Sequence, residues 1–275
     1  MEDYTSKLSN ALLPEHWRIV RRYNDNYIKQ RLQRLAGSAL PEAIEAYIVE
    51  IAQDNDKAMH FVENLNNSTS CFFRNNYSFS VLQQVVLPEI IARKTQSGSK
   101  TVRVWSMAAA GGQELYSVAI LLDELRYLHG GNIDVKLFAS DIDEQQIQFA
   151  QAGRYKYKDI EQVTEKRLKH YFSVENGECF VIDKKLIEGV SFNKFDLTDE
   201  NCSCPPESVF GDFDLIICAN VLIYYDKENA NKIFDKIAKC MANKAYVMTS
   251  ESERDMFQAK GFVEHVQQSG IFIRK

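Results

Sequence analysis

A strand, a loop of small residues and a helix follow one another between Val102 and Ser117 (VRVWSMAAAGGQELYS). Val102 to Trp105 has the β-branched, apolar character of a strand, and a helical pattern begins at Glu114. The loop Ala108–Gly112 presents almost no side-chain bulk, so main chain can come within contact distance of a ligand. The alternative is that these small residues serve only close packing of the strand against the helix.

A carboxylate one βα unit later favours the ligand hypothesis. Asp141 ends the strand in FASDID, the position that takes ribose hydroxyls in nucleoside-binding folds. The sequence contains neither G-x-G-x-x-G nor a P-loop, and Gln113 and Glu114 place a carboxylate where a helix N-terminus would otherwise bind an anion. These features favour a nucleoside without phosphates and with a cationic group, of which S-adenosylmethionine is an example.

The elements that must position these residues alternate between strands and helices. Apolar runs rich in Val, Ile, Tyr and Phe predict buried strands at 101–108, 134–141, 214–225 and 245–250. Helical patterns lie between them at 115–127, 144–152 and 227–241. The order predicts an α/β fold: a mostly parallel sheet with helices on both faces, with its ligand outside the carboxyl ends of the strands.

The first part of the chain is predicted to be a small, all-helical domain, residues 1–72. Its helices are expected within 15–36, from Pro41, and around 56–65. The segment from Glu15 to Ala36 contains two acidic residues and six basic ones: Arg18, Arg21, Arg22, Lys29, Arg31 and Arg34. This basic face is either a solvated helix surface or a docking surface for an acidic partner.

Composition limits the class of protein. A chain of 275 residues, 45% hydrophobic and 26% charged, can form one large α/β domain and a smaller one. A net charge of −5 does not favour nucleic-acid binding. The start of the chain has no leader pattern, and no window approaches the roughly 20 apolar residues that span a bilayer, so a cytoplasmic protein without membrane insertion is expected.

The cysteines predict neither a disulfide framework nor a metal site. They are scattered, most of them in apolar runs: Cys71, Cys179, Cys202, Cys204, Cys218 and Cys240. This distribution fits reduced, buried thiols. The CSCPP segment at 202–206 lacks a second Cys/His pair at ligand spacing, so no metal is expected there.

Four separated stretches resemble the CheR family of chemotaxis receptor glutamate O-methyltransferases. They are NNSTSCFFRN (66–75), WSMAAAGGQELYS (105–117), ASDID (139–143) and CANVLIYYD (218–226). The resemblance covers nearly the whole chain and implies a Rossmann-like, SAM-dependent methyltransferase domain over 73–275. It further implies transfer of a methyl group from S-adenosylmethionine to glutamate carboxylates in the cytoplasmic region of a chemotaxis receptor, with S-adenosylhomocysteine as product.

The resemblance also implies roles for individual residues. Arg74 and Tyr224 would be catalytic, the first holding the incoming carboxylate and the second orienting it near the methyl group. Arg31 and Arg34 would dock the receptor. The cofactor would be bound by Ser70, Arg74, Ala108, Gly112, Glu114, Asp141, Ile142, Asp196, Leu197, Asn220 and Val221. Phe72 and Phe73 are expected in the core, and Tyr224 alone would also suit a core position.

Four departures from the family pattern leave other hypotheses open. The family usually has Thr at Ser70, Glu at Gln113, Pro at Leu115 and Arg at Ala219. Ala219 removes a cation from the mouth of the expected site, which is compatible with a weakened member that binds the cofactor as a signalling sensor or scaffold. A methyltransferase for a small molecule or another protein is the third hypothesis.

Two further segments complete the prediction. Residues 167–195, with an ENGE turn, are expected to form a small antiparallel β insertion. In the family such an appendage can add a strand to a receptor tail, and a purely structural role is the alternative. The end of the chain (GFVEHVQQSGIFIRK) predicts an antiparallel hairpin at the sheet edge, and a monomer is expected.

Overall fold

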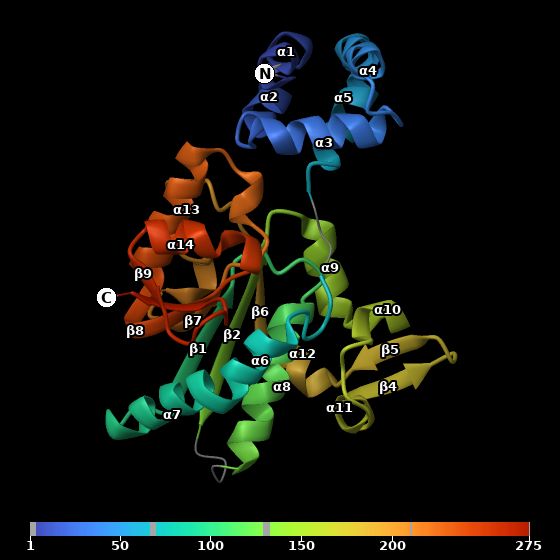
Figure 1. Ribbon diagram of the computed structural model, residues 1–275. Coiled ribbons are helices and arrows are strands. Elements are labelled where there is room, and N and C mark those ends of the chain that lie inside the picture. The colour runs from blue at the N-terminus through green and yellow to red at the C-terminus, as the bar shows by residue number, and fades with distance from the viewer. Residues whose placement is uncertain (1–3, 67–69, 129–132, 210, 275) are drawn as a thin grey trace. The chain divides into compact units, whose positions relative to one another are not determined.

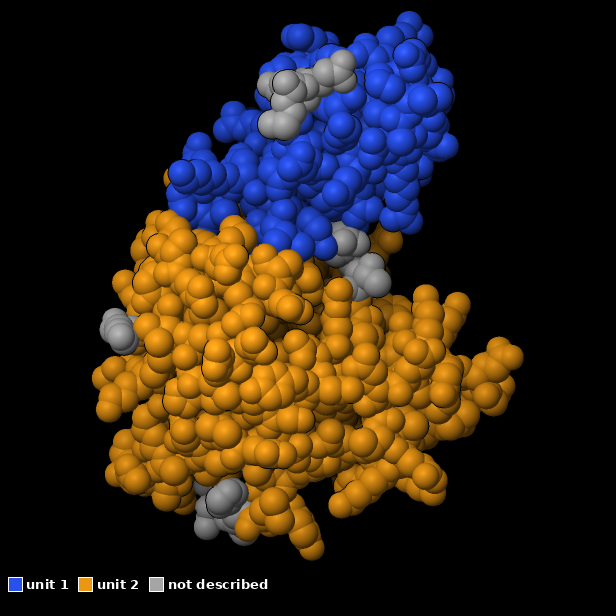
Figure 2. Space-filling view, in the orientation of Figure 1, with its two compact units in different colours: residues 1–67, 221–232 blue, residues 68–220, 233–275 orange. Residues whose placement is uncertain are grey.

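The computed structural model of the chain describes residues 4–66, 70–128, 133–209 and 211–274. It divides into two compact units, which Figure 2 shows in different colours. We call them the helical unit (Met1–Asn67 and Val221–Lys232) and the sheet unit (Ser68–Asn220 and Ile233–Lys275). The strongly apolar stretch 218–225 is therefore divided between the two.

The helical unit packs short helices around an aromatic and aliphatic core. Its helices are α1 (Tyr4–Ala11), α2 (Pro14–Val20), α3 (Asp25–Leu35), α4 (Pro41–Gln53), α5 (Asn55–Glu63) and the 3-10 helix η3 (Leu222–Tyr224). Prolines open α2 and α4, where a missing N–H costs nothing. Fully buried side chains such as Leu8, Ile28 and Phe61 form the core.

The basic segment 15–36 forms two helices instead of one, because a non-helical turn separates Val20, the end of α2, from Asp25, the start of α3. Asn24 ends the break as the N-cap of α3, its Oδ1 accepting a hydrogen bond of 2.9 Å from the Tyr27 amide. The expected helices from Pro41 and around 56–65 are confirmed as α4 and α5.

The sheet unit is built on seven strands in the order β6-β2-β1-β7-β8-β10-β9. The bounds are β1 (Thr101–Ser106), β2 (Asp134–Asp141), β6 (Val190–Lys194), β7 (Phe213–Ile217), β8 (Met241–Met248), β9 (Phe262–Glu264) and β10 (Ile271–Arg274). The first five are parallel, and β10 and β9 close the edge as an antiparallel hairpin. The predicted mostly parallel fold and the closing hairpin are confirmed.

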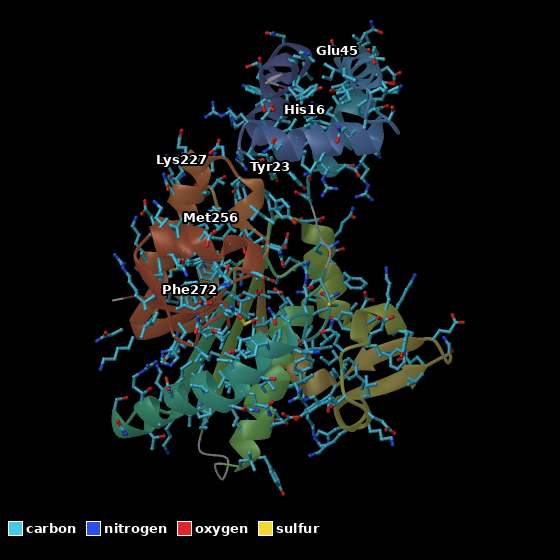
Figure 3. The ribbon with its side chains drawn as sticks, in the orientation of Figure 1. His16, Tyr23, Glu45, Lys227, Met256 and Phe272 are labelled. Carbon is cyan, nitrogen blue, oxygen red and sulfur yellow. A yellow bond between two sulfur atoms is a disulfide. The ribbon has the colours of Figure 1, made fainter. Side chains whose placement is uncertain are left out.

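Helices cover both faces of this sheet. They are α6 (Asn76–Val81), the π-helix η1 (Leu82–Val86), α7 (Leu87–Gln96), α8 (Gln113–Leu128), α9 (Glu144–Ala152), α13 (Lys227–Cys240), the 3-10 helix η4 (Glu251–Glu253) and α14 (Arg254–Ala259). Val102 and Val104 pack into the cluster that holds Ile90 of α7 and Leu121 of α8. On the opposite face Phe272, labelled in Figure 3, stacks on Phe257 of α14.

A small antiparallel sheet lies to one side of the main one (Figure 1). It consists of β3 (Arg154–Tyr155), β5 (Cys179–Ile182) and β4 (Phe172–Glu175), flanked by α10 (Tyr157–Ile160), α11 (Glu165–Tyr171) and α12 (Lys184–Glu188). The predicted hairpin around the ENGE turn is confirmed as β4 and β5. The bounds 167–195 are wrong at both ends, because β3 precedes them and β6 joins the main sheet beside β2. Two residues are too few to show a strand period.

Two other predictions are wrong. The strand expected at 214–225 ends at Ile217, because Asn220 adopts a left-handed φ of +58°. The thiols are neither all reduced nor all buried: Cys204 and Cys240 form a disulfide between the loop that carries the 3-10 helix η2 (Pro206–Ser208) and the end of α13, and Cys202 is exposed. A sequence separation of 36 gives no sign of that proximity.

No described helix is long and apolar enough to cross a membrane.

Candidate active site

The strand order reverses between β1 and β7, which places the end of each beside the other. From β1 the chain moves outward to β2 and β6, whereas β7 and β8 lie on the other side. A ligand crevice forms at such a switch point, outside the carboxyl ends of the strands. The loops after Ser106 and Ile217 are therefore the first candidates for a site.

The loop after β1 is tied to Asp141 at the end of β2. The Ala110 amide donates a 2.9 Å hydrogen bond to Asp141 Oδ2, and the Asp143 amide donates one of 3.0 Å to Oδ1. Burial raises the pKa of Asp141, and these amide donors oppose the rise. The structure thus brings together the loop and the acid that the sequence assigned to one site.

The shape of this loop depends on Gly112. Its φ is +83°, and a Cβ there would lie 2.9 Å from the ring of Tyr116 and 3.1 Å from Ala150. Ala110 also has a positive φ, +45°. Ala108 and Ile142 are half-buried at the two strand ends, so backbone and small side chains line this corner.

A cavity of about 810 Å³ in the sheet unit brings four of the singled-out residues together. Its lining includes Arg74, Glu114, Ala219 and Asn220. Burial raises the pKa of Glu114 to about 7, while the positive charge of Arg74 opposes this and the charge of Glu253 adds to it. The cavity therefore presents an exposed guanidinium and a buried carboxyl group that titrates near neutral pH.

Glu253 supports Asn220 in the lining of this cavity, and the sequence interpretation missed it. Its side chain is fully buried, and its Oε2 accepts hydrogen bonds from the Asn220 amide (2.8 Å) and from the Thr249 hydroxyl (2.9 Å). The Ser250 hydroxyl donates a third, of 2.6 Å. Glu253 therefore fixes the left-handed turn at Asn220. The S-x-x-E spacing of a capping box, Ser250 to Glu253, was the signal that could have revealed it.

Ser70 lies in a second cavity, of about 1010 Å³, whose lining includes Gln113 and Phe149. Within the described part of the chain, neither Ser70 Oγ nor Gln113 Oε1 has a hydrogen-bond partner, although both atoms are buried. Buried polar atoms normally find partners, so these two atoms are exceptions in the sheet unit. Gln113 directly follows Gly112 in the sequence, so this cavity adjoins the loop after β1.

Asp196 and Leu197 lie on the segment that follows β6. The Phe195 amide donates to the Asp141 carbonyl oxygen (2.9 Å), which joins this segment to the end of β2. Leu197 is buried, and Asp196 Oδ1 accepts from the amide and hydroxyl of Thr198 at 2.8 and 2.7 Å. Phe72 and Phe73 are buried in the core of the sheet unit, as predicted.

Val221 and Tyr224 belong to the helical unit. Val221 is buried, and the half-buried ring of Tyr224 lies 4.6 Å from the ring of Tyr27, centroid to centroid. Tyr23, labelled in Figure 3, stacks on Tyr225 at 5.4 Å and an interplanar angle of 13°.

The two arginines predicted for docking have different environments. Arg34 is exposed on α3. Arg31 is only 8% exposed, and its Nε and Nη2 donate to the Tyr27 hydroxyl at 2.9 and 2.8 Å. The expectation of an exposed Arg31 is therefore wrong: its apolar neighbours and its place one turn after Tyr27 turn it inward. No group of three or more acidic, His or Cys side chains that could hold a metal ion occurs among the described residues.

In a comparison with known protein families, residues 67–271 match the family model described as CheR methyltransferase, SAM binding domain. A Rhizobium etli protein named "Probable chemotaxis protein methyltransferase" is 30% identical over 74% of this chain and 74% of its own length. Chemotaxis protein methyltransferase 1 of Pseudomonas aeruginosa is 29% identical over 70% of this chain and 68% of its own.

Two solved structures that the chain resembles have lower sequence identity to it. PKMT2 from Rickettsia typhi in complex with AdoHcy is 16% identical, with a TM-score of 0.33, over 58% of this chain and 25% of that one. An S-adenosylmethionine-dependent methyltransferase from Mesorhizobium loti is 11% identical, with a TM-score of 0.29, over 58% and 52%.

Proposed function

The chain belongs to the CheR methyltransferase family, and from this premise we propose that it transfers a methyl group from S-adenosylmethionine to glutamate carboxylates of chemotaxis receptors. The observation that carries the proposal is the family match over residues 67–271, which spans the Gly112 loop, Asp141 and the Arg74 cavity. Related proteins named chemotaxis methyltransferases support the receptor as the substrate.

Bound S-adenosylmethionine supplies a methyl group activated by a sulfonium. We propose that Asp141 accepts hydrogen bonds from its ribose hydroxyls and that Glu114 faces its amino group. Ser70 Oγ and Gln113 Oε1 offer further polar contacts, since both are buried and lack a partner within the described residues. The backbone at Gly112 allows close approach because no Cβ intervenes. Ala108, Ile142, Asp196, Leu197, Asn220 and Val221 complete the proposed binding set.

The reaction needs alignment more than proton transfer. A glutamate of ordinary pKa, about 4.3, is already ionised at neutral pH. Its carboxylate oxygen forms a bond to the methyl carbon while the carbon–sulfur bond breaks, and the electron pair stays on sulfur. No proton moves, so no general base is required. Arg74 would hold the carboxylate by charge-assisted hydrogen bonds, and the Tyr224 hydroxyl would orient it.

The direct test is methyl transfer from labelled S-adenosylmethionine to isolated chemoreceptors, followed by mild base. Carboxyl methyl esters release methanol under these conditions, whereas N-methyl and ether products do not. We expect base-labile label on the receptor. Asp141→Asn should reduce the rate at limiting cofactor by about tenfold or more, since a buried hydrogen-bonding carboxylate is lost.

The matched control is Glu144→Gln, which changes an exposed acid on the neighbouring helix and should leave the rate unaltered. Base-stable label, or no label on receptors with the wild-type protein, would refute the proposed activity.

A further inference from the structure

One asparagine of the helical unit holds three consecutive backbone carbonyls around Tyr224. The Asn24 amide donates to the Tyr224 carbonyl at 2.9 Å. Asn24 Nδ2 donates to the carbonyls of Ile223 at 2.7 Å and Tyr225 at 3.3 Å. Asn24 and Ile223 are 199 positions apart in the sequence, so this clamp is a tertiary contact.

No other common side chain can make this set of bonds. Asn24 Oδ1 is already used as the N-cap acceptor of α3, from the Tyr27 amide. The two Nδ2 protons then serve the carbonyls of the 223–225 segment. Aspartate and serine can cap a helix, but neither offers two amide donors. Capping and clamping can therefore be separated by substitution.

Aromatic packing extends the clamp from the backbone to the ring of Tyr224. Tyr27, which follows Asn24 by one helical turn, packs on Tyr224 at 4.6 Å. The hydroxyl of Tyr27 is itself fixed, since it donates to the Leu65 carbonyl and accepts two hydrogen bonds from the buried Arg31. Arg31 therefore stabilises the surface against which Tyr224 rests.

The clamped Tyr224 borders a cavity of the helical unit. Tyr224 lines an open cavity of about 460 Å³ together with Asn26 and Gln30, and the Tyr224 side chain is half-buried. A ring held through its backbone and one face keeps a fixed position, which suits a group that orients a ligand.

We propose that Asn24 is a positioning residue for methyl transfer, which orients Tyr224 through the carbonyls of Ile223 and Tyr225. This inference rests on the proposed function, in which Tyr224 orients the acceptor carboxylate. Misplacement of a positioned group by about 1 Å can cost as much as 100-fold in rate. Asn24 should therefore act on kcat and leave cofactor and receptor binding nearly unchanged.

The test compares Asn24→Asp and Asn24→Ser with wild type. Both variants keep the N-cap acceptor, and serine adds no charge, so at least one should fold normally. We expect kcat to fall by about tenfold or more, while S-adenosylhomocysteine affinity and the receptor KM change by less than about twofold. The matched control is Asn64→Asp, which removes a 2.8 Å bond from Nδ2 to the His60 carbonyl in the same unit and should leave kcat unaltered.

A double-mutant cycle separates positioning from general stability. If Asn24 acts through the Tyr224 hydroxyl, Asn24→Ser should lower kcat by less than about threefold in a Tyr224→Phe background. Fully multiplicative losses would overturn the proposed route through Tyr224.

Amide hydrogen exchange reports on the clamp without any methyl transfer. Asn24→Ser should speed exchange at Asp226, whose amide donates to the Arg22 carbonyl at 2.9 Å. Unchanged exchange would overturn the clamp even in an active enzyme, and faster exchange with unchanged kcat would overturn its catalytic role. A wild-type protein without methyl transfer would instead refute the proposed function, and the exchange result would still decide the clamp.

Discussion

Asn220 and Tyr224 are close neighbours in the sequence, yet they are held by different means in different units. In the sheet unit, the buried Glu253 accepts from the Asn220 amide and from Thr249 and Ser250 near the end of β8. In the helical unit, the Asn24 side chain donates to the carbonyls that flank Tyr224. The Asn220 turn in the sheet unit and the Tyr224 segment in the helical unit therefore depend on separate hydrogen-bond sets.

The largest expected effect comes from removing the support of Asn220. Glu253→Ala would leave one buried and two part-buried donors without their acceptor and would open a cavity, which should lower the free energy of unfolding by about 4 kcal/mol. Glu253→Gln keeps the shape and one acceptor oxygen, and we expect about half that loss with S-adenosylhomocysteine affinity reduced about tenfold. Urea denaturation and calorimetric titration measure both quantities.

Exposed Glu251 on the same 3-10 helix is the control, and Glu251→Gln should leave the free energy of unfolding unaltered. If Glu253→Gln increased hydrogen exchange at Asp226 as strongly as an Asn24 variant does, the two hydrogen-bond sets would not be separate.

The second effect is a pH dependence confined to the sheet unit. Because the pKa of Glu114 is about 7 in the folded protein and near 4.5 when exposed, the folded state binds the extra proton between these values. The free energy of unfolding should then fall as the pH rises from about 4.5 to 7, by about 3 kcal/mol from this group. Glu114→Gln should remove this part of the slope in urea titrations at several pH values.

Exposed Glu144 provides the comparison, since Glu144→Gln should keep the wild-type slope. Identical slopes for wild type and Glu114→Gln would show that Glu114 is not the group responsible.

The smallest effect concerns receptor docking by Arg34. Arg34→Glu reverses an exposed charge, so we expect the receptor KM to rise about threefold at low salt and the difference to shrink as salt screens it. Arg126→Glu, an exposed change on α8, should have no such effect. Arg31→Ala should instead lower kcat, because Arg31 holds Tyr27. An unchanged KM for Arg34→Glu would leave the basic face of α3 as a solvated surface.

Local patterns predicted the parts of the site that a single segment builds. The small residues before Gly112, Asp141 at a strand end, and α9 with its bounds 144–152 all follow from strand and helix signals within about 20 residues. The hairpin at the end of the chain does as well.

Contacts between distant segments were not predictable in this way. Residues 218–225 have the apolar composition of a strand, but Glu253 and Asn24 capture their backbone in a turn instead. Arginine is usually found at solvated positions. Arg31 is buried because the Tyr27 hydroxyl accepts two hydrogen bonds from its guanidinium. The Cys204–Cys240 disulfide likewise joins segments whose proximity only the fold creates.

The central claim is that the sheet unit binds the cofactor while Tyr224, held by the helical unit, orients the acceptor carboxylate. The most direct test is single-turnover transfer by protein saturated with labelled S-adenosylmethionine, comparing Tyr224→Phe with wild type. We predict that the variant forms the same base-labile ester at a rate about tenfold or more below wild type, with S-adenosylhomocysteine affinity unchanged. Wild-type rates in Tyr224→Phe, or a matching loss of S-adenosylhomocysteine affinity, would contradict this division of roles.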